Sequence, residues 1–404
     1  MDVLFTLVLI STICLLGFTG NVIFKRTNIS FVLILMLFGM FLGPIFKVID
    51  ARSFFSIAPI FCTVALIILL FEGSLAFDFY KLIKLASRAT LLSTICFSGS
   101  ALVVALIWTL LGHPFLEGLL LGVICGGTSS VEIMALSKKL KKVSENSIIL
   151  LELEGAITDV FTIVFAFTIF NFIQNAGVGN VFQTMAASFS VGIMVGLLFW
   201  IFWSPIIKKV RNESFSYLVT LSYLFLIYVA AELVGGSGSL GILTFGILLA
   251  NGKKLMSGLG LAGDVFELDE KTKEFHSLIA FIIQTFFFVF LGLSFTLNNY
   301  ENIMIGCLLA AAIVFIRPFL VKIAMYKAQV GQKDLDLISI VLSRGLAAAV
   351  VAQILISKGA NPVFLDVVFM IIFMTIIITS TGVFFVLKED LKESQVKTET
   401  KESK

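Results

Sequence analysis

The sequence predicts an all-α polytopic membrane protein with about thirteen transmembrane helices. Of its 404 residues, 59% are hydrophobic and only 14% are charged, whereas soluble chains carry about 25% charged residues. Long apolar runs alternate with short charged clusters along the whole chain. Lipid-spanning helices of about 20 residues have this pattern. A soluble domain of this length could not cover so much apolar surface.

The helix boundaries follow from the positions where apolar runs meet charged residues or Gly, Asn and Pro. The predicted spans are 3–23, 29–48, 54–77, 88–111, 115–137, 147–174, 181–205, 214–234, 238–251, 274–297, 302–327, 335–357 and 363–388. The start MDVLFTLVLI lacks a basic n-region, so 3–23 is predicted to be a span and not a cleaved signal. One integral membrane domain covers 1–388. Residues 389–404 form a short cytoplasmic tail of mixed charge, which we expect to be disordered.

The distribution of Lys and Arg predicts the orientation. If the N-terminus lies outside, nearly all of the 29 basic residues fall in the tail or in loops after odd-numbered helices. The opposite side receives only Lys47, Arg52 and Lys358, while Arg317 and Arg344 lie within predicted spans. This asymmetry is the positive-inside pattern. It predicts an outside N-terminus and an inside C-terminus, in what we expect to be a prokaryotic cytoplasmic membrane.

An odd helix count permits two inverted six-helix repeats, about 1–174 and 214–388, joined by a linker helix at about 181–205. In that arrangement the fifth helix corresponds to the twelfth. Both are interrupted by small residues, at GGTSS (126–130) and at SRGLAAA (343–349). Matched interruptions of this kind indicate a binding site at the membrane midplane. The alternative is that the small residues only allow helices to pack closely.

The segment LLELEGAITDVFTIVFAF, residues 150–167, is apolar yet contains Glu152, Glu154 and Asp159. A carboxylate near the bilayer centre costs roughly 2.5–3.5 kcal/mol, so such acids usually have a function. On a helix, Asp159 is turned about 140° from Glu154 and lies roughly 7.5 Å further along the axis. The two acids are therefore expected to have different partners. Glu72 is a further acid inside a predicted span.

Other ionisable residues have simpler interpretations. Glu132 precedes a lysine cluster and is expected to extend towards the cytoplasm, and Glu232 lies at a helix end where it meets water. His113 belongs to an outer loop. His276 opens the tenth span, where a surface position is favoured over a role in the pH response.

The chemistry of a half-buried acid suggests cation and proton exchange. A partly desolvated carboxyl group has a raised pKa, which brings its titration towards physiological pH. It binds a cation when ionised and releases that cation when protonated, which is the minimum chemistry of an antiporter. The competing interpretation is a buried salt bridge that only fixes helix register. Several acids and two arginines near two helix breaks favour exchange.

Six motifs occur in the same order as in the cation:proton antiporter superfamily, and together they resemble its NhaP-like sodium/proton antiporters. They are LLFEGSLAFDF, CGGTSSVEIMALSKKLK, LELEGAITDV, ELVGGSGSLGILTFGILLANG, FHSLIAFIIQTFFFVFLGL and LSRGLAAAVVAQ. The resemblance covers nearly the whole chain. It implies an NhaA/NhaP-like antiporter fold with discontinuous helices 5 and 12. It also implies a mobile core domain, a dimerising domain, a homodimer and elevator-type alternating access.

The resemblance assigns roles residue by residue. Asp159 takes the place of the acid that binds both the cation and the proton, and Thr128 supplies oxygen from the unwound helix. Glu72 is similar to an acid that completes the Na⁺ transport site in some members. Glu154 matches an acid that is paired with an arginine on the eleventh helix, for which Arg317 is the candidate.

Arg344 matches the arginine at the second helix break. The sequence departs from the usual pattern at four other positions. Ser129 and Ser130 stand where Asp-Pro is frequent, and Gly155 replaces a frequent Ser. Serine hydroxyls such as that of Ser129 could replace the missing acid as cation ligands. Thr158 replaces the usual Asn, and because electrogenic relatives have an acid there, it suggests electroneutral exchange.

The predicted function is therefore secondary active exchange of Na⁺ or Li⁺ for H⁺, with Asp159, Glu154, Thr128, Ser129, Thr158 and Glu72 as candidate ion- and proton-binding residues. A K⁺/H⁺ antiporter is the nearer alternative, because the helices do not separate Na⁺ from K⁺. A remote alternative is an intramembrane serine protease, from GGSG (235–238) with His276 as base. GSGSLG (236–241) fits a dinucleotide motif but lies between membrane helices. No cofactor, nucleic-acid partner or enzymatic activity is expected.

Overall fold

The computed structural model describes residues 3–27, 30–49, 58–75, 79–129, 132–133, 144–174, 181–210, 216–258, 270–297, 299–326, 328 and 330–402. Every regular element in these residues is helical, so the prediction of an all-α fold is confirmed. The elements are α1 (Val3–Thr27), α2 (Phe31–Met40), η1 (Phe41–Ile45), α4 (Ala58–Leu75), α5 (Phe79–Leu110), α6 (Phe115–Ile124), α8 (Glu145–Gln174), α9 (Val181–Val210), α10 (Ser216–Leu233), α11 (Gly238–Gly258), α12 (Glu270–Ser294), α13 (Tyr300–Ala324), α14 (Gln332–Ile340), α15 (Leu346–Ser357) and α16 (Val363–Glu402).

The helices form two compact units. Unit 1 comprises Met1–Ser56, Ser87–Ala166 and Thr285–Lys404. Unit 2 comprises Ile57–Ala86 and Phe167–Gln284. The inverted repeats and the linker helix stay predictions from the sequence.

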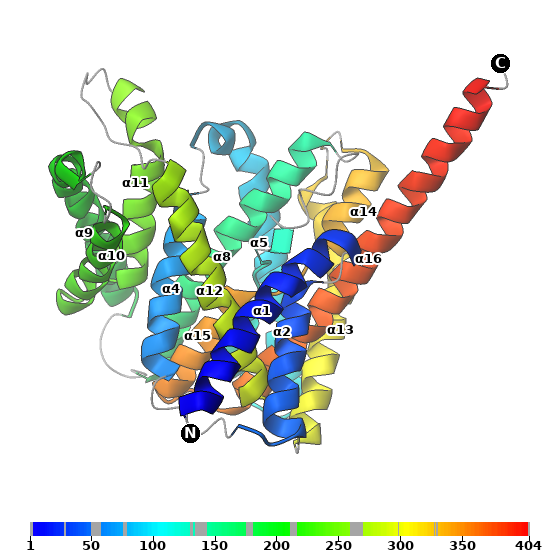
Figure 1. Cartoon of the computed structure of the whole chain (residues 1–404), viewed down its shortest axis with the longest axis horizontal. Helices are drawn as coiled ribbons and strands as arrows, with labels where there is room; N and C mark the ends of the chain where they lie inside the picture. The colour runs from blue at the N-terminus through cyan, green and yellow to red at the C-terminus, as the bar shows by residue number, and fades with distance from the viewer. Residues whose placement is uncertain are drawn as a thin grey trace. The chain divides into compact units, whose positions relative to one another are not determined.

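The centre of unit 1 is the apolar part of α16. This helix lies beside α13 along much of its length, and it also contacts α14, α15, α6 and α2 (Figure 1). Its inner face is fully buried, with side chains such as Phe364, Val367 and Phe369 at 1% exposure or less. Burial of an aromatic or branched aliphatic side chain contributes about 1.5–3 kcal/mol relative to exposure. The α16 helix therefore organises the elements that hold the candidate site.

Small residues bring two helices of unit 1 into backbone contact. A Cβ added at Gly39 of α2 would lie 2.9 Å from the Cα of Gly292 on α12, and the reverse distance for a Cβ at Gly292 is 3.0 Å. Any larger side chain at this crossing would have to push the backbones apart. Such small-residue crossings are typical of helices that pack in lipid.

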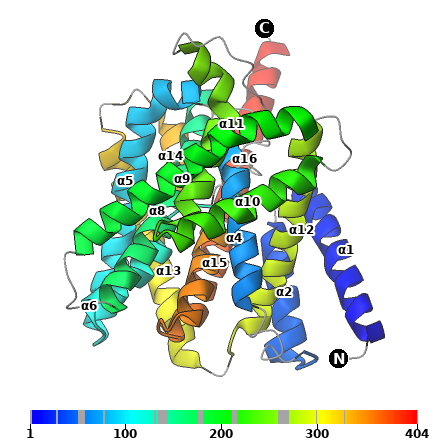
Figure 2. The ribbon, with the colours of Figure 1, turned by 90° about the vertical axis from the view of Figure 1, so that its left-hand side faces the viewer.

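Unit 2 is built around α11, which packs against α9, α10 and α4; α9 and α10 also run beside each other (Figure 2). Trp203 of α9 is 1% exposed and lies against the rings of Tyr223 and Phe245, with centroid distances of 4.6 Å and 6.0 Å. These aromatic contacts join all three helices α9, α10 and α11 into one layer.

Seven described helices are long and apolar enough to cross a membrane, by length and composition. Six shorter apolar helices accompany them: Leu7–Ile23, Phe31–Ile45, Phe115–Ile124, Tyr217–Leu233, Gly238–Gly252 and Leu346–Ser357. Large apolar side chains such as Phe315, at 87% exposure, and Leu110, at 85%, face outward from these helices. Extensive exposed apolar surface of this kind fits contact with lipid rather than water. The chain is a multi-pass membrane protein, and the count of thirteen spans stays a prediction.

Both predicted helix breaks are present, although the second was predicted at 343–349 and ends at residue 345. The first half of the fifth span is α6, which ends at Ile124, and residues 125–129 are not helical. The twelfth span is divided into α14 and α15 by the extended residues 341–345. Gly and Ser favour such breaks because they lose little by leaving a helix.

Two segments differ from the prediction in their kind of structure, and not only in their bounds. The second span leaves the α-helical form at Phe41 and continues as the π-helix η1, which contains Pro44; a proline inside a helix removes one hydrogen bond and disturbs the turn before it. The tail, expected to be disordered, continues α16 as a helix to Glu402. The stretch KEDLKESQVKTETKE contains neither Gly nor Pro and is rich in Glu, Lys and Gln, which are good helix formers.

Candidate functional site

The first helix break is fastened to the middle of α8 by two threonines. The backbone N–H of Thr128 donates to Thr158 Oγ1 at 3.0 Å, and the two hydroxyl oxygens are 3.4 Å apart. Thr158 Oγ1 also lies 3.2 Å from the carbonyl oxygen of Gly155. Both threonines are 1% exposed. The Thr158 hydroxyl thus accepts from a backbone N–H that has no helical partner in the unwound segment.

Gly127 lets the break approach α8 closely. A Cβ at this position would lie 2.8 Å from Thr162 Oγ1 and 2.9 Å from the carbonyl oxygen of Thr158. Real Cβ atoms do not approach backbone oxygen so closely, so any other residue would push the break away from the helix.

Gly127→Ala is therefore expected to lower stability by about 1–3 kcal/mol, the usual cost of overpacking, and to slow transport. The measurement is the thermal unfolding midpoint of the purified protein, together with its transport rate. Gly73→Ala in α4 is the matched control, because nothing lies within 4 Å of a Cβ there. Equal midpoints for the two variants would show that the approach at Gly127 is unimportant.

The two helix breaks contact each other directly. Ser129 N–H, in the first break, donates to the carbonyl oxygen of Ser343, in the second, at 2.8 Å. Gly345 packs against the Ser129 side chain so closely that a Cβ there would collide with it. The sequence placed these breaks at corresponding positions; in the structure they cross.

Hydroxyl groups of α16 satisfy the backbone of the second break. Thr379 Oγ1 accepts from Leu342 N–H at 3.2 Å, and Thr375 Oγ1 accepts from Arg344 N–H at 3.0 Å. Buried backbone groups without a partner are costly, and these two threonines, both at most 1% exposed, remove that cost. Their spacing of four residues puts them on one face of the helix.

Arg317 of α13 connects α8 with the second break. Its Nη2 donates to Glu154 Oε2 at 2.8 Å, and its Nη1 donates to Glu154 Oε1. Nη2 also lies 3.1 Å from the carbonyl oxygen of Ile338 and 3.0 Å from that of Val341. Arg317 and Glu154 are both 0% exposed. One guanidinium therefore neutralises a buried acid and binds the carbonyl end of α14, where a positive charge is favoured.

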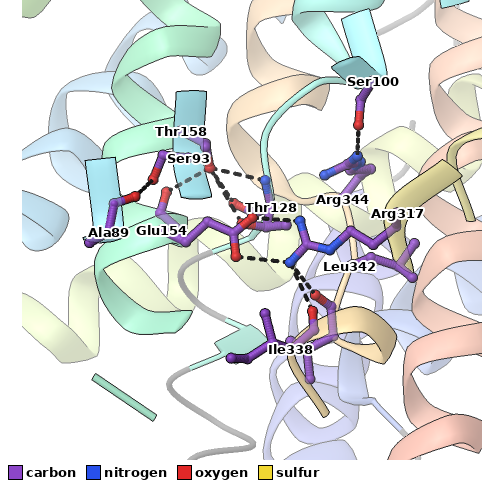
Figure 3. Close-up of polar contacts among 12 residues, drawn as sticks. Ala89, Ser93, Ser100, Thr128, Glu154, Thr158, Arg317, Ile338, Leu342 and Arg344 are labelled. Atoms are coloured by element: carbon purple, nitrogen blue, oxygen red, sulfur yellow. Dashed lines mark hydrogen bonds and ion pairs between the residues drawn. The ribbon is translucent and has the colours of Figure 1, made fainter. Parts of the chain in front are cut away.

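Arg344 is the second fully buried arginine. Its Nη2 lies 3.2 Å from Ser100 Oγ, whereas Nε and Nη1 have no hydrogen-bond partner among the described residues. Figure 3 shows the Arg344 side chain directed towards Ser100 and the Arg317 side chain directed towards Glu154. The two arginines thus have different surroundings: one is paired with an acid, and the other is held by a neutral hydroxyl.

Asp159 lies on α8 directly after Thr158 and five residues after Glu154, and its side chain is half-buried. Glu152, closer to the start of α8, is also half-buried. The acids of α8 therefore differ in environment: Glu154 is fully enclosed and paired with Arg317, and Asp159 keeps partial exposure. Ser130, one of the departures from the family pattern, lies outside the described residues.

Glu72 belongs to unit 2 and contacts a histidine. Its Oε2 lies 3.3 Å from His276 Nε2, and its side chain is 29% exposed. The expected surface position of His276 is wrong, because this residue is 1% exposed. The α12 helix begins at Glu270, four residues before the predicted start, so His276 lies more than one turn inside the helix and faces α4.

Glu132 also differs from the expectation that it extends towards water. It is 4% exposed, and its carboxylate accepts a hydrogen bond from the Ser30 hydroxyl. Ser30 is the N-cap of α2, where its oxygen accepts from Val32 N–H at 3.2 Å.

Several residues around the helix breaks of unit 1 were not singled out in the sequence: Ser30, Ser100, Thr375 and Thr379. A signal existed for two of them. A pair of threonines four residues apart in an otherwise apolar helix indicates a polar partner on that face. The others depend on which helices become neighbours, which the sequence of one helix does not specify.

Comparison with solved structures shows the same fold. The structure of the sodium proton antiporter MjNhaP1 from Methanocaldococcus jannaschii superposes with a TM-score of 0.81 at 21% sequence identity, covering 96% of this chain and 99% of that one. This similarity supports the predicted NhaP-like antiporter fold.

The similarity to curated relatives covers less than half of each relative. The K(+)/H(+) antiporter NhaP2 of Shewanella baltica is 28% identical over 275 residues, which is 65% of this chain and 45% of the relative. Sodium/hydrogen exchanger 8 of Arabidopsis thaliana is 25% identical over 307 residues, or 70% of this chain and 38% of the relative. The chain spans less than half the length of these relatives.

The transmembrane sodium/hydrogen exchanger family matches residues 8–389, nearly the whole chain. This is a family of transporters, which sets aside the intramembrane protease as an alternative. The motifs of the sequence, the fold and this match lead to one conclusion: the chain belongs to the sodium/hydrogen exchanger family.

Proposed function

We propose that the protein exchanges a monovalent cation for H⁺ by secondary active transport, with Asp159 as the acid that carries either ion. The observation that supports this most is the difference between the acids of α8. Glu154 is fully buried and both of its oxygens accept from Arg317, whereas Asp159 is half-buried and directly follows the threonine that joins α8 to the first break. A carboxylate that releases and rebinds ions needs a route to water, and partial exposure supports such a route for Asp159.

Glu154 and Arg317 have a different task in this proposal. Their charges cancel each other, and the guanidinium holds the end of α14 in place. They give the two breaks a fixed arrangement during the transport cycle. Removal of one partner leaves an uncompensated buried charge, which is strongly destabilising.

The cation would be bound by oxygen atoms near Asp159. Broken helices supply hydroxyl and carbonyl oxygens to Na⁺ in transporters of this architecture. Thr128, Thr158 and Ser129 are the candidates, all in unit 1. The family resemblance separately implies that the acid Glu72 assists cation transport. The hydroxyl of Thr158 already holds Thr128, so the same contact that shapes the break would also orient its oxygens.

A neutral residue at position 158 supports electroneutral exchange. One titrating acid at the site binds one monovalent cation or one proton, so each cycle moves no net charge. Na⁺ or Li⁺ is the cation that we propose first. K⁺ is the second candidate, because several of the curated relatives are described as K(+)/H(+) antiporters.

We further propose that the protein works as a homodimer by elevator-type alternating access, as its family resemblance implies. The distribution of basic residues supports an outside N-terminus and an inside C-terminus in the cell membrane. The transported cation and the proton would be its only ligands, and no cofactor takes part.

The test is the collapse of a pH gradient in vesicles that contain the purified protein, after Na⁺, Li⁺ or K⁺ is added separately. Na⁺ and Li⁺ are expected to collapse the gradient, and an imposed membrane voltage is expected to leave the rate unchanged. A response to K⁺ alone would favour the second candidate, and a strongly voltage-dependent rate would exclude one-for-one exchange. Vesicles without protein are the control for leakage.

A further inference from the structure

Glu132 is a buried acid of unit 1 that has no part in the proposed exchange cycle. It is 4% exposed, and its carboxylate accepts a hydrogen bond from the Ser30 hydroxyl. Ser30 is 1% exposed, and its oxygen also accepts from Val32 N–H at 3.2 Å as the N-cap of α2. One hydroxyl therefore holds the first turn of α2 and donates to an acid that lies 102 positions away in the chain.

The backbone of Glu132 belongs to the helical turn that follows the first break. Ile133 N–H donates to the Ser129 carbonyl oxygen at 3.1 Å, and Glu132 N–H donates to Ser129 Oγ at 3.4 Å. Ser129 is thus the N-cap of this turn, and Glu132 occupies the third helical position. This is the S-x-x-E spacing of a capping box, in which the glutamate side chain returns to the N–H of its own N-cap residue.

The Glu132 side chain does not close that box. Ser129 N–H donates to the Ser343 carbonyl oxygen at 2.8 Å, and the Glu132 carboxylate binds Ser30 instead. The first break is therefore held on two sides: its backbone is bound to the second break, and its capping acid is bound to another helix. Since a buried carboxylate is costly unless it accepts hydrogen bonds, the Ser30 contact also favours this position of the side chain.

The α2 helix is firmly packed within unit 1. Its backbone meets that of α12 where Gly39 and Gly292 cross, and a Cβ on Gly39 would lie 2.9 Å from the Gly292 Cα. It also contacts α1 and α16. A row of hydrogen bonds thus connects a well-packed helix, through Glu132 and Ser129, with the second break.

We propose that Glu132 is a positioning residue for cation transport: its hydrogen bond with Ser30 holds the first break in the arrangement that binds the cation. This proposal rests on the proposed function, in which Thr128 and Ser129 supply oxygen atoms to the cation. Oxygen atoms that are already held in place lose less freedom when an ion binds, which improves affinity. Loss of the contact between Glu132 and Ser30 should therefore weaken cation binding more than it slows the maximal rate.

The experiment compares Glu132→Met, Glu132→Gln, Ser30→Ala and the double variant Ser30→Ala/Glu132→Met in vesicles, with Na⁺ as the probe. Glu132→Met and Ser30→Ala are each expected to raise the apparent KM for Na⁺ roughly tenfold, or about 1.4 kcal/mol, with little change in the maximal rate. The double variant should raise KM no further, because both changes remove the same contact. Glu132→Gln should keep most of the affinity, since its amide oxygen still accepts from Ser30.

Two controls separate this effect from a general loss of packing. Ser30→Ala also removes the N-cap of α2, which should lower the thermal unfolding midpoint with or without Glu132, whereas KM should respond only when Glu132 is present. Ser74→Ala removes a hydroxyl that is 0% exposed and donates within its own helix, to the Phe71 carbonyl oxygen at 2.7 Å. That variant should leave KM unchanged.

Three results would overturn the proposal: an unchanged KM in Ser30→Ala, additive effects in the double variant, or a KM in Glu132→Gln as high as in Glu132→Met. The last result would show that the charge of the carboxylate, and not its hydrogen bond with Ser30, serves the cation. If Glu132→Met fails to fold, Ser30→Ala and Glu132→Gln decide the matter, because the first must raise KM and the second must not.

Failure of this proposal is distinguishable from failure of the proposed function, because hydrogen exchange at the first break can be measured without transport. Deuterium uptake of the peptide that contains this break should rise in Glu132→Met and Ser30→Ala, and should stay at the native level in Ser74→Ala. Native uptake in the first two variants refutes the role of Glu132. If Asp159→Asn still exchanges Na⁺ for H⁺, the carrier assignment itself is wrong, whatever the uptake.

Discussion

Asp159→Asn is expected to abolish cation-driven proton movement. Asparagine keeps the size of the side chain and most of its hydrogen bonding, but it neither titrates nor offers a negative charge to a cation. Because the proposed cycle depends on one acid that holds either ion, no residual exchange should remain. The measurement is the rate of pH-gradient collapse in vesicles after Na⁺ is added.

Glu152→Gln is the matched control for this prediction. Glu152 lies on the same helix, seven residues earlier and on a similar face, and is also half-buried. Its neutralisation is expected to leave most of the exchange activity. If the two variants lost activity equally, the charge of the whole helix and not the single acid would be responsible.

Removal of one partner of the Glu154–Arg317 pair should have the largest effect on stability. Arg317→Met leaves the Glu154 carboxylate buried and unpaired, and it also releases the carbonyl groups of Ile338 and Val341. The expected loss is about 3–5 kcal/mol, as for other buried pairs from which one partner is removed. It would appear as a large decrease in the thermal unfolding midpoint, accompanied by loss of transport.

The double variant Glu154→Met/Arg317→Met tests whether the two residues act as one unit. With both charges gone, no unpaired charge remains, so the loss should be smaller than the sum of the two single losses. Lys322→Met, an exposed residue on the same helix, serves as the control and should change little. Additive losses in the double variant would contradict the interpretation of these two residues as one unit.

The helix breaks were predictable because they depend on local chemistry. Gly126, Gly127 and Gly345 are weak helix formers, and their matched places within two long apolar runs favoured an interruption over close packing alone. The positions of the acids on α8 could also be predicted, because they depend only on the spacing within one helix. Two acids five residues apart cannot share one helix face, so separate partners could be expected from the sequence.

The residues that were mispredicted depend on contacts between distant segments. His276 was expected at the surface because it lies near a charged helix start, but α4 and α10 cover it. Glu132 was expected to extend towards the cytoplasm like the lysines after it. Its carboxylate instead accepts a hydrogen bond from Ser30, the N-cap of α2. Neither neighbour could be inferred from the pattern of one helix, since periodicity defines a face and not what covers that face.

The most direct test of the central claim is the number of protons released when Na⁺ binds to the purified protein in weakly buffered detergent solution. At a pH where Asp159 is protonated, one proton should leave for each cation bound, and Asp159→Asn should release none. Cation binding without proton release in the native protein, or unchanged release in Asp159→Asn, would contradict competition of the two ions for this carboxylate.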